Sequence, residues 1–239
     1  MEEWRLLDLE YPDRPYYNMA VEEAIPIAVN KGLAPNTLRF WRNDNAIVIG
    51  RFQCGVLEVR IKECLKHGTC VVRRFTGGGA VYHDKENLNY ALSVRKPHPL
   101  ATGSILDWFK VVGKAVIKGF EKLGVKADFK PINDVEINGR KVSGMAGSII
   151  GNVIFAHGCI LVNSDISVLV KVLNIPREKL SDKKVKKAGK RVITLKEALG
   201  RHVSMSEVKE ALKKGFEEVF NVKLVPGELS SEEWEIVEE

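Results

Sequence analysis

The sequence has few cysteines, and their spacing does not suggest that they bind metal or pair with one another. The four, Cys54, Cys64, Cys70 and Cys159, include no CxxC pair and no Cys/His spacing of the zinc kind. Neither a structural zinc nor a disulfide framework is therefore expected, and we interpret all four as reduced thiols.

Long apolar runs and a leader segment are also absent. No run approaches the roughly 20 apolar residues that a membrane helix needs, so we do not expect a membrane protein. The first residues, MEEWRLLDLEYPDRP, lack the positively charged segment followed by a long apolar one that marks a secretory signal. We therefore expect a cytoplasmic location.

What is present is the composition of an ordinary globular protein, with 45% hydrophobic and 28% charged residues. A chain of 239 residues can bury a sizeable core. We expect one compact domain over residues 1–239, with a core of about residues 4–175, a basic loop region over 176–203 and a C-terminal helical appendage over 204–239.

The net charge of +6 is concentrated in one stretch, KLSDKKVKKAGKR, residues 179–191. The stretch has no aromatic residues for base stacking, so a solvated loop or helix face is favoured over a nucleic-acid-binding patch. A third interpretation is a docking surface for an acidic protein, or a loop beside an anionic ligand. Nucleic acid is therefore not expected as a partner.

Capping residues and apolar periodicity predict several helices. Asn18 is expected to cap a helix that ends at Gly32, with Pro26 as a kink or an early stop. Ser104 and Asp107 have capping-box spacing before a strongly amphipathic helix that ends near residue 124. Two further helices are expected after the cap pairs Ser204 with Glu207 and Ser230 with Glu233.

An Asn-Gly turn predicts a hairpin in the second half of the chain. Both turn positions of Asn138-Gly139 need positive φ, which makes this pair a strong hairpin signal, and it joins strand 134–137 to strand 140–143. Lys141 therefore lies on a strand near a tight turn.

A second turn, Gly151-Asn152, predicts another hairpin, and in its second strand His157 and Cys159 alternate onto one face. Residues 37 to 50 are expected to form two short strands around a turn at residues 43–45. Together these elements predict an α+β fold: a mixed, largely antiparallel sheet flanked by helices.

The stretch RRFTGGGAVYHD, residues 73–84, places three adjacent glycines between two β-rich segments. The loop is therefore strand-turn-strand, unlike the strand-to-helix loops of dinucleotide or P-loop sites, and no GxxxxGK[ST] motif occurs. Residues without Cβ let the backbone contact a ligand and present successive N–H groups to an anion. The alternative is a wide hairpin turn or bulge. Nearby cations favour a phosphate or carboxylate ligand.

Three strings, RRFTGGGAVYHD, INDVEINGRKVSGMAGS and HGCILVN, stand in an order and spacing that resembles the lipoate-protein ligase A catalytic domain. This family belongs to the superfamily that also holds biotin ligases and octanoyltransferases. NMAVEEA and LRFWRNDNAIVIGRFQ add to the resemblance, which covers roughly residues 4 to 175. A GRGRxGRxW-like string, typical of biotin ligases, is not found. The resemblance implies the biotin/lipoate protein ligase catalytic fold.

The activity that the resemblance implies is ATP-dependent. ATP, with Mg²⁺, and lipoate or octanoate would give an acyl-adenylate, which a lysine of a lipoyl-carrier protein then attacks. The carrier would be a glycine cleavage H protein or an E2 lipoyl domain. By similarity, Lys141 is the catalytic cation that contacts the acyl carbonyl and the phosphate, which fits the charge that develops there. An exposed strand lysine is the alternative.

The resemblance also implies a set of substrate- and adenylate-binding residues. His83 and His157 have a structural alternative each, since the first could bond within its loop and the second could be a satisfied core histidine. Asp134 is also the expected Mg²⁺ ligand. The full set is Arg73, Gly77, Gly78, Gly79, Val81, His83, Asn133, Asp134, Ser143, Gly144 and His157.

Two departures from the ligase pattern leave alternatives open. Cys159 follows His-Gly where a small hydroxyl residue is expected, and octanoyltransferases of the superfamily take octanoyl from acyl-carrier protein through a cysteine. In a run such as CILV, a buried inert cysteine is the commoner case. The separate C-terminal ligase domain also has no counterpart here, so we expect it on another polypeptide. A non-catalytic acyl- or nucleotide-binding module is the remaining alternative.

Overall fold

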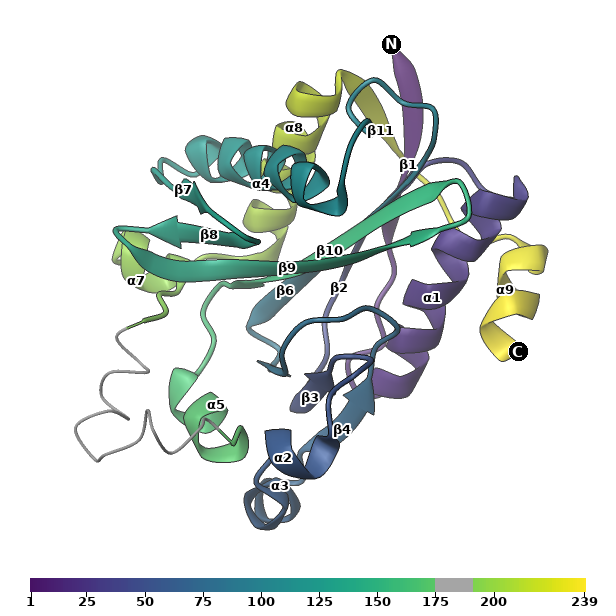
Figure 1. The fold of residues 1–239 in the computed structure, drawn as a ribbon. Helices are drawn as coiled ribbons and strands as arrows, with labels where there is room; N and C mark the ends of the chain where they lie inside the picture. Colours follow the sequence, from purple (N-terminus) through teal and green to yellow (C-terminus); the bar gives the residue numbers. More distant parts are fainter. Residues whose placement is uncertain (175–190) are drawn as a thin grey trace.

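The computed structural model describes residues 1–174 and 191–239, and its strands form two sheets (Figure 1). The larger sheet has eight strands in the order β11-β1-β2-β6-β10-β9-β8-β7, and the smaller has three in the order β4-β3-β5. The strands are β1 (Glu2–Asp8), β2 (Thr37–Trp41), β3 (Ala46–Ile49), β4 (Cys70–Arg73), β5 (Val81–His83), β6 (Asn87–Arg95), β7 (Asp128–Lys130), β8 (Asp134–Ile137), β9 (Arg140–Ile150), β10 (Val153–Leu161) and β11 (Val222–Pro226).

The large sheet is mixed but mainly antiparallel. Strand β1 pairs in parallel with β2 and β11, and each of the other neighbouring pairs in this sheet is antiparallel. The α+β class and the mixed, largely antiparallel sheet flanked by helices are therefore confirmed. Strand β11, which extends the sheet beyond β1, was not predicted.

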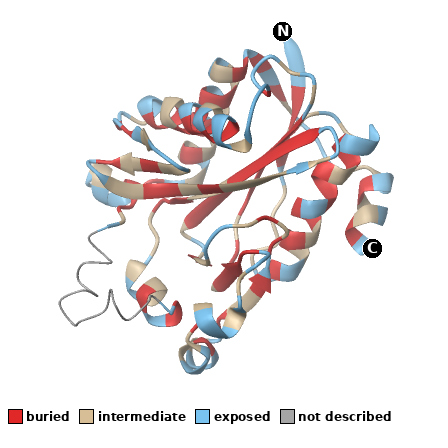
Figure 2. Cartoon of the chain, viewed as in Figure 1, coloured by how far each residue is buried: buried red, intermediate tan, exposed pale blue. Residues whose placement is uncertain are grey.

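Helices cover both faces of the large sheet (Figures 1 and 2). Trp108 and Phe216 belong to the main core under α4 and α8, whereas Val21 and Val237 belong to a second core between the sheet, α1 and α9. The helices are α1 (Pro15–Lys31), α2 (Gly55–Glu58), α3 (Ile61–His67), α4 (Ile105–Lys122), α5 (Ile166–Val172), α7 (Leu195–Leu199), α8 (Met205–Phe220) and α9 (Ser231–Glu238).

The first helix begins earlier than its sequence suggests. Helix α1 starts at Pro15. Proline is tolerated there because the first N–H groups of a helix have no intrahelical acceptor, so the N–H that proline lacks is not needed. Asn18 is therefore not a cap but a buried residue inside the helix, where its side chain accepts a hydrogen bond from Arg39. Pro26 does not end the helix, which continues to Lys31 before Gly32 closes it at φ +83°.

The other helix and turn predictions agree with the structure. Ser104 and Asp107 form a capping box at α4, and Ser204 and Ser230 cap α8 and α9. Asn138 and the glycine after it have positive φ in the β8–β9 turn. The predicted second hairpin is β9–β10.

Residues 37–50 do form two strands, but the strands lie in different sheets, since β2 belongs to the large one and β3 to the small one. Strand β3 also lies between β4 and β5. The glycine segment that joins β4 to β5 therefore crosses over β3, and it is not the hairpin turn that we had as the alternative.

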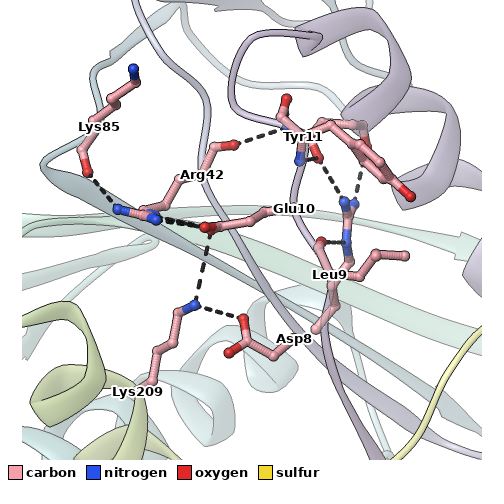
Figure 3. Close-up of polar contacts among 9 residues, drawn as sticks. Asp8, Leu9, Glu10, Tyr11, Arg42, Lys85 and Lys209 are labelled. Atoms are coloured by element: carbon pink, nitrogen blue, oxygen red, sulfur yellow. Dashed lines mark hydrogen bonds and ion pairs between the residues drawn. The ribbon is translucent and has the colours of Figure 1, made fainter.

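Residues 204–239 are an integral part of the fold rather than a helical appendage. Phe216 of α8 lies in the main core, and β11 is a strand of the large sheet. Lys209 of α8 also pairs with Asp8 at 2.6 Å and lies 3.9 Å from Glu10, whose carboxylate accepts hydrogen bonds from Arg42 (Figure 3). The predicted appendage is wrong because its helix packs on α4 and its strand pairs with β1.

Of the basic stretch 179–191, residues 179–190 lie outside the described residues. Arg191 is described, and its carbonyl accepts a hydrogen bond from the backbone N–H of Lys141 at 2.9 Å. In the described part of the chain, none of the helices has the length and apolar character that crossing a membrane requires.

Candidate active site

A pocket lies where the β4–β5 segment meets strands β9 and β10 and helix α1. Its lining contains most of the residues that the sequence singled out. These are Gly78, Gly79, Val81, His83, Asn133, Lys141, Gly144, His157 and Cys159.

Four predicted residues are not part of the lining. Asp134 contacts Lys141, which does line the pocket. Ser143 is buried, and its hydroxyl lies 3.5 Å from the hydroxyl of Tyr90. Gly77 precedes the two lining glycines. Arg73 is exposed and donates to the carbonyls of residues 50, 51 and 53, so it holds the loop after β3 and does not face the pocket.

The guanidinium in the pocket is that of Arg74, which the sequence analysis did not choose. Arg74 is buried and donates to the carbonyls of Gly77 at 2.7 Å and Gly79 at 2.8 Å. Burial lowers the pKa of Arg74, and Cys159 and Glu22 act to raise it. Arg74 therefore shapes the glycine segment from inside the pocket.

The glycines of this segment are required by close packing. Gly78 has φ +90°, and a Cβ there would lie 2.9 Å from Nη2 of Arg74. Its carbonyl also lies so near Gly50 that any side chain at Gly50 would overlap it. The backbone at Gly78 and Gly79 thus reaches the pocket with no side chain between it and a ligand.

Lys141 is fixed at the pocket by its backbone and by an ion pair. Its N–H donates to Arg191 and its carbonyl accepts from Ile193, both at 2.9 Å, so strand β9 is held at this residue. The Nζ atom lies 2.7 Å from Oδ1 of Asp134, and the lysine side chain is 42% exposed. The Lys141 ammonium group is therefore held in place by Asp134 and is still exposed enough to contact an anionic ligand.

A buried chain of polar groups links α1 to the glycine segment. Oε2 of Glu22 lies 3.1 Å from Nδ1 of His157, whose Nε2 lies 2.7 Å from the hydroxyl of Thr76. Oε1 of Glu22 accepts a hydrogen bond from Nε1 of Trp41 at 3.0 Å. His157 is therefore a satisfied histidine that also lines the pocket. Sequence reasoning missed Glu22, whose only signal was its place in NMAVEEA.

His83 is buried and neutral. Burial lowers its pKa to about 3, and the nearby Arg74 cation acts in the same direction. Its Nδ1 lies 3.4 Å from the side-chain amide of Asn43. Its Nε2 and the amide nitrogen of Asn89 have no hydrogen-bond partner in the described part of the chain, and both residues line the pocket. Two buried donors are therefore available to a ligand.

The Cys159 thiol lines the pocket and is half-buried. Burial raises its pKa, although the charges of Lys141 and Arg74 act to lower it. A thiol is nucleophilic mainly as the thiolate. Within residues 1–174 and 191–239, no group of three or more His, Cys, Asp or Glu residues could hold a metal ion. The cations that line the pocket are those of Lys141 and Arg74.

Comparison with known proteins gives one consistent group. The sequence model of the lipoyl protein ligase A/B catalytic domain matches residues 14–217. Octanoyltransferase LipM of Brevibacillus brevis is 32% identical, over 100% of this chain and 95% of its own length. Lipoate-protein ligase A subunit 1 of Thermoplasma acidophilum is 35% identical, over 92% of this chain and 85% of its own.

Solved structures agree with this grouping. A bi-partite lipoate protein ligase of Thermoplasma acidophilum, described with its E2 lipoyl domain, superposes with a TM-score of 0.91 at 32% identity, covering 100% of this chain and 91% of that one. A lipoate-protein ligase A bound with ATP gives a TM-score of 0.87 at 29% identity, covering 100% and 93% of the two chains. A putative lipoate protein ligase with bound lipoic acid, also from Thermoplasma acidophilum, gives 0.85 at 28%, covering 100% and 94%.

Proposed function

The chain belongs to the lipoyl protein ligase A/B catalytic domain family, and from this we propose that it is an ATP-dependent lipoate-protein ligase. In the first step a carboxylate oxygen of lipoate or octanoate attacks the α-phosphorus of ATP, and pyrophosphate leaves. In the second step the amine of a carrier lysine attacks the acyl carbonyl of the adenylate, and AMP leaves. The product is an amide between the acid and the carrier lysine.

One observation carries this proposal: the pocket is lined by an exposed lysine that an ion pair holds in place. Lys141 is 42% exposed and is directed by Asp134, whereas burial raises the pKa of Cys159. Two anions approach one another in the first step, so a preorganised cation lowers the barrier, by about 3 kcal/mol for a typical donor. The backbone N–H groups of Gly78 and Gly79 can donate hydrogen bonds to the same negatively charged phosphate.

Mg²⁺ commonly binds proteins through one or two carboxylates together with substrate phosphates, so a cage of three ligands is not required. Asp134 fits this donor set, because its side chain is 28% exposed and only Oδ1 lies against Lys141. Asp134 would hold the ion. The chemistry that Mg²⁺ supplies when bound is neutralisation of phosphate charge.

A second candidate function is octanoyl transfer from acyl-carrier protein to a lipoyl domain through Cys159. The octanoyltransferase relative spans almost the full length of both chains, and Cys159 lies in the pocket beside the charges of Lys141 and Arg74. The relatives' names favour this candidate, whereas the raised pKa of the thiol favours the ligase. The retained cation argues against a non-catalytic binding module.

Pyrophosphate release from ATP by the purified chain, with and without lipoate or octanoate, tests the proposal. Acid-dependent release that survives in Cys159→Ser and is lost in Lys141→Ala supports the ligase. Absence of release, together with octanoyl transfer from octanoyl-acyl-carrier protein that Cys159→Ser abolishes, would establish the transferase instead. Normal ligand binding with neither activity would indicate a binding module.

The likeness to a bi-partite ligase and to a protein named subunit 1 supports a separate accessory subunit. We propose that the chain lipoylates an E2 lipoyl domain or a glycine cleavage H protein slowly until that subunit is added. If the isolated chain already lipoylates its carrier at the rate of the two-subunit mixture, the accessory subunit is not needed.

A further inference from the structure

An exposed apolar patch lies on the short helices α2 and α3 and the loop before them, beside the pocket. Exposed large apolar side chains are concentrated over residues 52–65, and none of α2 is buried. Cys64 is the residue of α3 that faces inward, towards the small sheet. The patch consists of Phe52 (84% exposed), Val56 (64%), Leu57 (65%), Ile61 (50%) and Leu65 (78%).

Basic side chains surround this patch. None of the ion pairs among the described residues involves these cations. Glu63, the acidic residue of α3, lies 3.6 Å from His67. A groove between α3 and α5 carries four of the cations, so positive charge and apolar surface occur together. The cations are Arg51, Arg60, Lys62, Lys66 and Lys171.

The patch continues to the edge of the pocket. A Cβ on Gly77 would lie 4.0 Å from Cδ2 of Phe52, and the next two glycines line the pocket. The loop that carries Phe52 is held in place, because Arg73 donates to its carbonyls and the side chain of Gln53 accepts from Gly50. The backbone on either side of Phe52, whose ring is 84% exposed, is thus tethered beside the glycine segment.

We propose that this patch is the docking surface for a carrier domain that presents apolar and acidic residues around its acceptor lysine. The inference rests on the proposed function, because only an acyl transfer to a protein requires the carrier to approach the pocket. A carrier must place its lysine at the reacting carbonyl and therefore contacts the surface beside the opening. Apolar residues rimmed by cations suit an acidic protein with an apolar centre.

Cys54 allows a direct test, because it is exposed within the patch while Cys64 is buried. We expect an unlipoylated E2 lipoyl domain to slow maleimide labelling of Cys54, followed by peptide mass spectrometry, about tenfold or more at saturation. This readout needs no turnover. Unchanged labelling of Cys54 at carrier concentrations that saturate transfer would overturn the proposal.

Charge reversal gives an independent test. In Lys62→Glu/Lys66→Glu the KM for the lipoyl domain should rise about tenfold or more, because like charges then oppose docking. The matched control Lys114→Glu/Lys126→Glu changes two exposed cations elsewhere, with the same change of net charge, and should leave this KM within about twofold.

Acid-dependent pyrophosphate release without the carrier separates failure of this inference from failure of the ligase. It should be the same in wild type and both double variants. If wild type releases none, the ligase proposal fails, and the docking surface is judged by Cys54 labelling alone. If both double variants keep the wild-type KM, and only Lys62→Glu/Lys66→Glu loses binding to anionic phospholipid vesicles, the patch is a membrane surface and the proposal is wrong.

Discussion

The Nζ atom of Lys141 lies 2.7 Å from Oδ1 of Asp134, and it occupies the space that a side chain at position 144 would need. A Cβ on Gly144 would lie 2.5 Å from that Nζ and 2.6 Å from Cε. Gly144 thus leaves room for the lysine to reach its partner on the neighbouring strand. The glycine is part of the way in which the hairpin directs the cation.

Gly144→Ala should therefore act on Lys141 while changing the fold little, because the atoms it would strike are the end of a flexible side chain. We expect acid-dependent pyrophosphate release to fall roughly 10²- to 10³-fold, as for loss of one preorganised donor. The melting temperature should change little. The double variant with Lys141→Ala should be no slower than Lys141→Ala alone, since both changes remove the same interaction. A wild-type rate in Gly144→Ala would show that Lys141 needs no such space.

Glu22→Gln should change the proton position on His157. The carboxylate lies 3.1 Å from Nδ1, which favours a proton on Nδ1 and leaves Nε2 to accept from the Thr76 hydroxyl 2.7 Å away; an amide N–H at position 22 would favour the opposite tautomer. We expect the KM for the acid to rise about tenfold, as for loss of a charged hydrogen bond, with a smaller change in kcat. Nitrogen chemical shifts of His157 should report the change of tautomer.

Glu22→Asp and Thr76→Ser serve as controls for that prediction. The first keeps a carboxylate at a shorter reach, and the second keeps the hydroxyl. Both should retain the wild-type tautomer. If Glu22→Gln leaves the nitrogen shifts unchanged, the carboxylate does not set the proton position.

Much of the fold and some of the site could be predicted from local sequence. The Asn138-Gly139 turn and the Ser104 cap are local features, so Lys141 and the α4 helix were found in place. Arg73 and Arg74 are adjacent, and no local pattern indicates which of them enters the pocket. That choice depends on how β4 packs beside β3, which is a property of the assembled sheet.

Other features depended on contacts between distant segments. Strand β11 pairs with β1 across most of the chain, and nothing in its five residues indicates that their partner is the first strand. Glu22 lies among the mostly apolar buried residues of α1, and the residue it faces, His157, lies on the distant strand β10. Pairings of this kind are set by tertiary structure, which residue propensities do not encode.

The C-terminal helix should depend on one buried ion pair. Arg5 donates two hydrogen bonds of 2.6 Å to the Glu233 carboxylate, which is fully buried. Glu233→Ala leaves the guanidinium without its partner, so we expect the free energy of unfolding to fall by about 3 to 5 kcal/mol in urea titrations. The exposed neighbour change Glu232→Ala should cost less than about 0.5 kcal/mol. Equal stabilities of the two variants would mean that the ion pair contributes nothing net.

His83 should make the protein less stable in mild acid. Its pKa is about 3 in the folded protein because of burial, against roughly 6.5 in the unfolded chain. Between these values the unfolded state binds a proton that the folded state does not, so stability rises with pH and falls as pH drops below 6.5. The loss from pH 7 to pH 4 is on the order of 3 kcal/mol. His83→Asn should lack this part of the pH dependence in urea titrations, whereas the exposed His202→Asn should keep it; equal slopes in both variants would contradict a buried neutral His83.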